Sequence, residues 1–221
     1  MEKEDQGYDR TATMFSPEGR IIQAEYAKKA AGMGSDAVGI VCNDGVIIIA
    51  NKKQDKLAGF SEKIIQVDDH IGVAVAGIIS DSFSLISEAQ VLAQKHRVTY
   101  DSEIDVKSVV KKICSVMQSY TQFEGVRPFG VDLMVAGVDE KPHLFVIEPM
   151  GTFLEYKASA IGEHAAEIKE ELRKEYKSGI TLKEAKTLCI NILKKILIHE
   201  FKPSSIDGFI ISLKDRTFKK L

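Results

Sequence analysis

The sequence has 221 residues, of which 44% are hydrophobic and 28% charged, and its formal net charge is −2 at pH 7. This length and hydrophobic content suit one domain with a substantial core. The small net charge excludes a strong pull toward nucleic acid or an anionic membrane, and no hydrophobic run approaches the roughly 18 residues of a membrane span. We therefore expect no nucleic-acid partner and no membrane partner.

The first predicted element is a short amphipathic helix behind a tight turn. In F-S-P-E-G, Pro17 presets one backbone angle and Gly19 permits a positive φ, as turns require. Gly32 and Gly34 are expected to end the helix. A helix this short is marginal in water, so it must pack on another element. Its predicted apolar face recurs every four residues: Ile22, Tyr26 and Ala30.

Four strands follow as two predicted hairpins. The first turns at Asn43-Asp44-Gly45, a strong hairpin signal, and the second at Asp68-Asp69-His70. A polar loop that continues to Ser61 separates the hairpins. The predicted strands are Ala37–Cys42, Val46–Ala50, Lys63–Val67 and Ile71–Gly77.

Two pairs of helices and further strands complete the chain. A cap is expected at Ser80 or Asp81, and Thr181 and Glu184 form a capping-box pattern. The predicted helices begin at Ser80, Asp105, Glu163 and Thr181. The predicted strands are Val131–Gly137, Leu144–Glu148, Phe153–Ser159, Phe209–Leu213 and Thr217–Phe218.

This order predicts an α+β fold. Strands joined by hairpins form antiparallel sheets, and paired helices cover the outer faces of those sheets. A four-layer αββα sandwich fits without a long structureless loop, although the pattern alone leaves several α+β arrangements open.

Cysteines and histidines give no sign of a metal site or a disulfide framework. Cys42, Cys114 and Cys189 lie far apart within apolar patterns, which predicts buried free thiols in a reducing compartment. The five histidines show no metal-ligand spacing and are predicted to be surface or turn residues. With no phosphate-binding glycine motif either, we expect no cofactor and no metal. The acidic start of the chain is unlike a secretory signal, so an intracellular protein is expected.

Several motifs resemble those of the α-type subunits of the 20S proteasome, especially the archaeal ones. The N-terminal signature of that family is similar to Y-D-R at 8–10 followed by F-S-P-E-G-R-I-I-Q-A-E-Y-A at 15–27. Further likeness lies in E-K-I-I-Q-V-D-D (62–69), G-V-R-P-F-G-V-D-L (125–133) and G-T-F-L-E-Y-K-A-S-A-I-G (151–162). The resemblance implies the αββα sandwich of N-terminal-nucleophile hydrolases over residues 1–221. It assigns the arm and first helix to 1–34 and the sandwich to 35–221.

The resemblance also raises an enzymatic alternative. The related β subunits cleave peptides with an N-terminal threonine, and Ser35 stands at that position here. Ser35 is internal, Asn51 replaces an acidic residue, and Glu163 stands where a serine is needed. Lys63 and Gly77 match the β-site lysine and oxyanion glycine, but these two make no complete site. We expect no catalytic residue; an active hydrolase that uses Ser35 after processing is the alternative.

In this family, seven α subunits form an outer ring on the β ring, and their N-terminal arms gate the entry of unfolded protein substrates. The resemblance places five residues at the gate positions: Tyr8, Asp9, Arg10, Pro17 and Tyr26. From the residues alone, Tyr8 and Tyr26 are ordinary anchors of an arm. A free-standing oligomeric scaffold, without β partners, is a further hypothesis.

Activators of the family, such as an ATPase regulatory particle, insert C-terminal tails between adjacent α subunits. The resemblance implies that Lys63 pairs with the carboxylate of the tail; from the residues alone, Lys63 is a surface lysine at a strand end. Met33 stands where a lysine is common near the pocket, a departure that bears on activator affinity. The expected location is the cytoplasm, or also the nucleus in a eukaryote. The other implied docking residues are Gly19, Glu25, Gly34, Gly77 and Ile78.

Overall fold

The computed structural model describes residues 7, 8, 10, 11, 13–52, 62–198 and 201–221. Sheet A holds, in spatial order, β10 (Phe218–Lys220), β9 (Ile206–Ser212), β2 (Gly45–Asn51), β1 (Ala37–Cys42) and β8 (Ala158–Ile161). Sheet B holds, in spatial order, β3 (Ile64–Asp68), β4 (Ile71–Gly77), β5 (Val131–Val138), β6 (Pro142–Ile147) and β7 (Phe153–Glu155). Neighbouring strands are antiparallel in both sheets.

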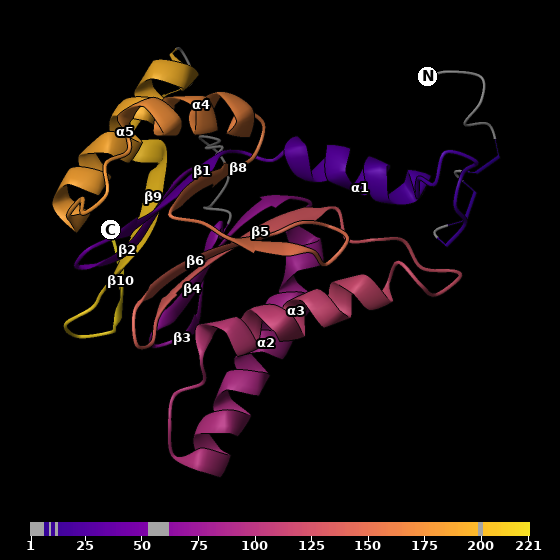
Figure 1. Ribbon diagram of the computed structural model, residues 1–221, viewed down its shortest axis with the longest axis horizontal. Coiled ribbons are helices and arrows are strands. Elements are labelled where there is room, and N and C mark those ends of the chain that lie inside the picture. The colour runs from indigo at the N-terminus through magenta and orange to yellow at the C-terminus, as the bar shows by residue number, and fades with distance from the viewer. Residues whose placement is uncertain (1–6, 9, 12, 53–61, 199–200) are drawn as a thin grey trace.

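Helices cover the outer face of each sheet (Figure 1). The helices are α1 (Ile22–Gly32), α2 (Ile79–Tyr100), α3 (Val106–Ser119), α4 (Ala165–Glu175) and α5 (Leu182–Leu197), followed by a 3₁₀ turn at Pro203–Ser205. One apolar layer joins α2 and α3 to sheet B, a second joins the two sheets, and a third joins sheet A to α4 and α5. The predicted four-layer αββα sandwich is therefore confirmed. Among the described helices, none has the length and apolar character that a bilayer crossing requires.

Local signals in the sequence predicted both hairpins and the start of α5 correctly. Asn43 and Asp44 link β1 to β2, where Cys42 pairs with Gly45. The capping box at the start of α5 is complete, since the Glu184 amide donates to the Thr181 hydroxyl and the Thr181 amide to the Glu184 carboxylate. Such a cap satisfies backbone groups that have no partner within the helix. The polar loop predicted before Ser61 lies outside the described residues.

The strand predicted at Phe153–Ser159 is wrong as a single element. Residues Phe153–Glu155 form β7 on sheet B, whereas Ala158–Ile161 form β8 on sheet A. Tyr156 and Lys157 carry the chain from one sheet to the other. The alternating pattern shows that each half is extended, but it does not show which strand each half pairs with.

The predicted apolar face of α1 is also wrong in part. The buried residues of α1 are Ile22, Ala24, Ala27 and Ala31, while Tyr26 and Ala30 are half-buried. Small alanine side chains allow the helix backbone to come close to β4 and β5. At the Gly77 position, for example, an added Cβ would lie 2.7 Å from the Ala31 Cα. Close packing of backbones, rather than large apolar side chains, determines how this helix sits.

All three cysteines are buried and free, as predicted. Burial raises the pKa of Cys42 and of Cys114 to about 12. Burial also raises the pKa of Cys189, which is fully enclosed between α5 and sheet A. Thiols held in this protonated state are inert side chains of the core.

Candidate functional site

Four of the predicted docking residues meet where α1, β4 and β5 come together. Gly34 follows the end of α1, and a Cβ added there would lie 2.0 Å from the Gly77 amide nitrogen. Gly77 has a φ of +107°, and a Cβ there would lie 2.3 Å from the Gly130 carbonyl oxygen. The Ile78 amide donates to that same carbonyl over 2.9 Å, and the Ile78 side chain is 39% exposed. Glycine is required here because three backbone segments touch.

Lys63 lies beside this junction and is buried, with 3% of its surface exposed. Its ammonium donates to the Val75 carbonyl over 2.7 Å and to the Ser35 carbonyl. The interpretation of Lys63 as a surface lysine at a strand end is therefore wrong. A buried ammonium is stable only with hydrogen-bond acceptors around it, and these two carbonyls supply them. Lys63 thus joins the end of β4 to the segment that enters β1.

The remaining docking residues, Gly19 and Glu25, lie at the opposite end of α1. The Gly19 amide donates to the Ser16 carbonyl over 2.8 Å in a turn with a φ of +76° at Gly19. Arg20 forms a forked ion pair with Glu25, with 2.6 Å from its Nε to one carboxylate oxygen. Hydrogen bonding to Arg20 lowers the pKa of Glu25. Because the 11 residues of α1 span about 16 Å, one chain carries the predicted docking residues as two separate groups.

The predicted gate residues occupy the arm and the exposed side of the turn. Tyr8 and Tyr26 are half-buried, Arg10 and Pro17 are exposed, and Asp9 lies outside the described residues. Arg10 lines a cavity of about 410 Å³ together with Gln23 of α1 and the loop at 124–127. The described part of the arm therefore lies against the segment that carries the G-V-R-P-F-G motif.

An ion pair fixes that motif to α2. Asp81 accepts two hydrogen bonds from the Arg127 guanidinium, at 2.6 and 2.8 Å, and one from the Gly130 amide at 2.9 Å. Hydrogen bonding to Arg127 lowers the pKa of Asp81. The prediction of Ser80 or Asp81 as the cap of α2 is wrong, because Ile78 occupies that position and makes no side-chain capping bond. The carboxylate of Asp81 serves a long-range contact instead.

The residues that the enzymatic alternative places around Ser35 form hydrogen bonds with other parts of the chain. The Oδ1 atom of the Asn51 side chain accepts from the Ser205 hydroxyl over 2.7 Å, and the Glu163 backbone amide donates to the Gly34 backbone carbonyl over 2.8 Å. Asp36, next to Ser35, is buried and lies 2.9 Å from Nδ1 of His164. Hydrogen bonding to Asp36 raises the pKa of His164. Sequence reasoning missed this pair, because its two members lie 128 positions apart.

Two histidines contradict the prediction that every histidine is a surface or turn residue. His70 is fully buried and its Nε2 lies 2.7 Å from the Ile104 carbonyl oxygen. His143 is 9% exposed, with Nδ1 2.7 Å from Glu155 and Nε2 2.9 Å from Asp139. Both rings join strands to neighbouring segments. Within the described ranges, no three acidic, histidine or cysteine side chains come together as a metal site.

Two family profiles match this chain. The profile described as "Proteasome subunit" matches residues 32–211, and the profile of the N-terminal signature of A-type proteasome subunits matches residues 8–30. The chain belongs to the proteasome subunit family. The second match covers the turn and most of α1 and identifies the chain as α-type.

Archaeal relatives agree with this assignment. The proteasome alpha subunit of Methanocaldococcus jannaschii is 45% identical over 218 residues, which cover 97% of this chain and 83% of that protein. The protein of the same name from Archaeoglobus fulgidus is 44% identical over 218 residues, or 97% of this chain and 89% of that protein. The one from Thermococcus sibiricus is 44% identical over 97% of this chain and 84% of that protein. The resemblance stated from the sequence is confirmed, and with it a place in protein degradation.

Proposed function

We propose that this chain is a non-catalytic structural and gating subunit of a 20S proteasome core. It forms the outer heptameric ring with other α subunits, stacks on β subunits in the cytoplasm, and controls the entry of unfolded protein substrates. The observation that carries this proposal is the α-type signature at residues 8–30, which folds as a turn and a helix directly ahead of Ser35. With this segment in place, Ser35 has no free amine to serve as the base of an N-terminal nucleophile.

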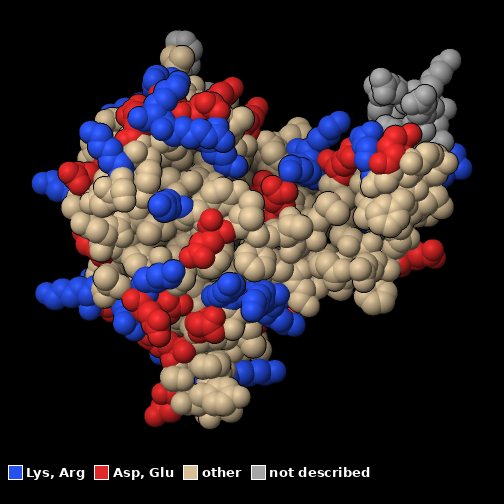
Figure 2. Space-filling view, in the orientation of Figure 1, with Lys and Arg blue, Asp and Glu red and all other residues tan. Residues whose placement is uncertain are grey.

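The lobe around α1 offers a surface for neighbours in a ring. On the face drawn in Figure 2, charged side chains follow the upper edge of this lobe, where α1 lies, and uncharged side chains fill the part below it. Exposed apolar side chains before and after α1 include Met14, Phe15 and Met33, and those of the loop ahead of β5 include Phe123 and Val126. Large apolar side chains left exposed in a single chain are compatible with a surface that a partner covers. A ring of identical chains requires such a face to meet a different face of the next copy.

The docking of an activator tail rests on the two groups at the ends of α1. Lys63, Gly34, Gly77 and Ile78 form one group, and Gly19 and Glu25 the other, about 16 Å away along the helix. We infer that a complete pocket needs both groups from adjacent subunits, with Lys63 as the cation that faces the carboxylate of the tail. In the chain alone, the Lys63 ammonium already bonds two carbonyls, so docking must bring the tail to this buried point.

Native mass spectrometry of the purified protein tests the proposal. One subunit has a mass of 24.4 kDa, so seven make 7 × 24.4, or about 171 kDa, and a double ring has twice that mass. We expect the seven-fold species, or its formation when a β-type partner is added, with residues 1–34 intact in every subunit. Cleavage before Ser35 with peptidase activity would support the hydrolase instead. A protein that stays monomeric with the β partner present would refute the ring.

A further inference from the structure

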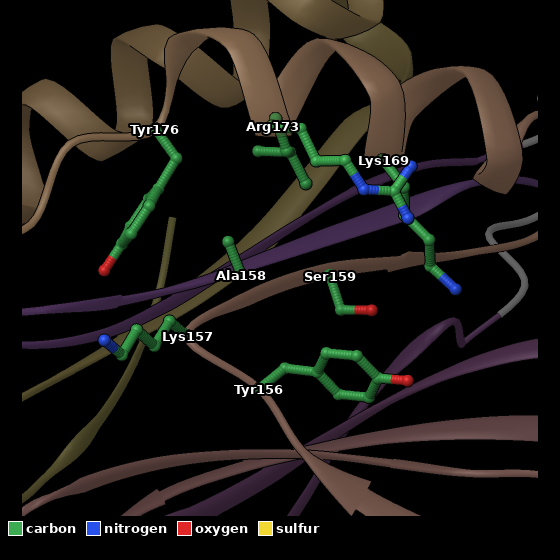
Figure 3. A pocket seen from close by; sticks show the side chains of 8 residues that line it. Tyr156, Lys157, Ala158, Ser159, Lys169, Arg173 and Tyr176 are labelled. Carbon is green, nitrogen blue, oxygen red and sulfur yellow. The ribbon is translucent and has the colours of Figure 1, made fainter.

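A second cavity lies where the chain crosses from sheet B to sheet A, and none of the candidate gate or docking residues lines it. It has a volume of about 250 Å³ and is lined by the crossing segment and by α4 (Figure 3). Tyr156 and Tyr176 flank it, and Ser159 of β8 lies among its lining residues. We call it the crossing pocket. It does not depend on ring formation or on gating.

Three cationic side chains line the crossing pocket: Lys157, Lys169 and Arg173. The lining includes no carboxylate from the described residues. Lys169 is half-buried, and burial lowers its pKa, with the charge of Arg173 acting in the same direction. An ammonium that is withdrawn from water beside a second cation is stabilised by any anion that reaches it. This end of the pocket therefore favours a negatively charged group.

The buried hydroxyl of Ser159 supplies a hydrogen-bond donor. Ser159 is fully buried, and its Oγ has no hydrogen-bond partner in the part of the chain that the structure describes. Figure 3 shows this oxygen, the Tyr156 hydroxyl and the Lys169 ammonium directed to the same side. A buried hydroxyl without a partner costs free energy, so an acceptor at this point would remove that cost.

Two carboxylates act on Lys169 from behind the pocket. Glu148 is paired with Lys28 of α1 over 3.0 Å. Asp132 of β5 attracts the Lys169 ammonium, but no ion pair within 4.0 Å joins the two among the described residues. The positive charge of Lys169 is thus only partly balanced inside the chain. Lys157 and Arg173, at the exposed rim, add to the positive potential on the solvent side.

We propose that the crossing pocket binds a phosphate group, with Lys169 as its charge partner and the Ser159 hydroxyl as a donor. Phosphate oxygens accept charge-assisted hydrogen bonds of the kind that lysine and hydroxyl groups provide. The cavity of about 250 Å³ exceeds a single ion, since one water occupies roughly 30 Å³ in the liquid. The space between Tyr156 and Tyr176 therefore suits the small organic body of a phosphate monoester better than free phosphate.

Isothermal titration of the purified protein in phosphate-free buffer tests this site, with inorganic phosphate and with glycerol phosphate as separate probes. We expect saturable binding of both, tighter for the ester. Equal affinities would assign the site to the free ion. Lys169→Ala should weaken binding roughly tenfold or more, as for a lost charge-assisted bond. Lys183→Ala, which removes an exposed lysine of α5, is the matched control and should leave binding unchanged.

Ser159→Ala separates binding from a structural role. The substitution removes a hydroxyl that has no partner among the described residues, so the melting temperature of the free protein should stay level or rise. Phosphate binding should nevertheless weaken several-fold, since a neutral hydrogen bond is lost. Absence of saturable binding of both probes at millimolar concentration would overturn the proposal, as would wild-type affinity in both the Lys169→Ala and Ser159→Ala variants.

Discussion

At the scale of single residues, burial changes the protonation of a carboxyl group in this fold. Asp132 lies in an otherwise apolar strand, and burial, with the Glu148 carboxylate as a further cause, raises its pKa to about 6. Folding therefore favours the protonated form of this group. Below its ordinary pKa of 3.8 the carboxyl is protonated in both the native and the unfolded state and does not affect stability. Between pH 3.8 and about 6 the unfolded state loses the proton first, so the native state loses up to about 3 kcal/mol of stability over this range.

Asp132→Asn should remove this penalty. At pH 8 we expect the free energy of unfolding to rise by about 1–3 kcal/mol, because no charge remains to be desolvated. Near pH 4, where the wild-type carboxyl is protonated, the two proteins should be nearly equal. Urea denaturation at both pH values measures the difference. Glu140→Gln, at an exposed position, serves as the control and should show no such change. A variant less stable than wild type at pH 8 would contradict this account.

The sequence could nominate candidate site residues, but it could not predict their surroundings. Lys63 was found by its place in a motif, yet its burial depends on the Ser35 carbonyl, 28 positions away. The pairing of His164 with Asp36 likewise joins distant segments. Hydropathy and residue spacing predict local secondary structure. They do not predict which distant segments of the backbone come into contact after folding.

At the scale of helices and strands, short sequence motifs correctly predicted the turns and caps that depend only on neighbouring residues. The Asn43-Asp44 turn and the Thr181 capping box are encoded within four or five residues, and both were found. The split between β7 and β8 was missed, because Phe153–Ser159 is one extended pattern and the choice of sheet is made by the partners β6 and β1. Tertiary pairing, not propensity, decides that boundary.

The attachment of α1 to the sandwich depends on Gly34. Gly34→Ala would place its Cβ 2.0 Å from the Gly77 amide nitrogen, and backbone atoms cannot move aside as a side chain can. We expect a loss of about 3 kcal/mol in the free energy of unfolding, as for other overpacked sites. Gly32→Ala is the matched control: its Cβ has nothing within 4 Å, and alanine favours helix, so it should be neutral or stabilising by up to about 1 kcal/mol.

Urea denaturation of these two variants measures both effects. Equal stability of Gly34→Ala and wild type would show that the junction of α1 with β4 adapts to a side chain. The close contact between Gly34 and Gly77 would then no longer explain why glycine stands at this position.

At the scale of the whole molecule, the division of the docking residues predicts behaviour that only an assembly can show. The group around Lys63 and the group around Glu25 are held apart by α1 within each chain. If adjacent subunits complete the pocket, a ring of Lys63→Ala chains and a ring of Glu25→Gln chains should each lose binding of an activator tail. Each variant must first form the ring by native mass spectrometry, since Lys63 also bonds two backbone carbonyls.

Mixed rings of the two variants should recover part of the binding. With random mixing, about one pocket in four receives both groups intact from different chains. Tail-peptide binding to mixed rings, compared with either pure ring, measures this recovery. Pockets completed within one chain would never recover, because every chain then carries one defect. The experiment therefore distinguishes a pocket between subunits from a pocket within one.

The three buried thiols can serve as probes of how the sandwich opens. Cys114 belongs to the layer between α3 and sheet B, while Cys42 and Cys189 belong to the layer between sheet A and α5. A thiol reagent reacts with the thiolate, so each cysteine reacts only when its own layer separates and admits water. Pulse labelling followed by peptide mapping would measure the opening rate of each outer layer separately, with no probe added to the chain.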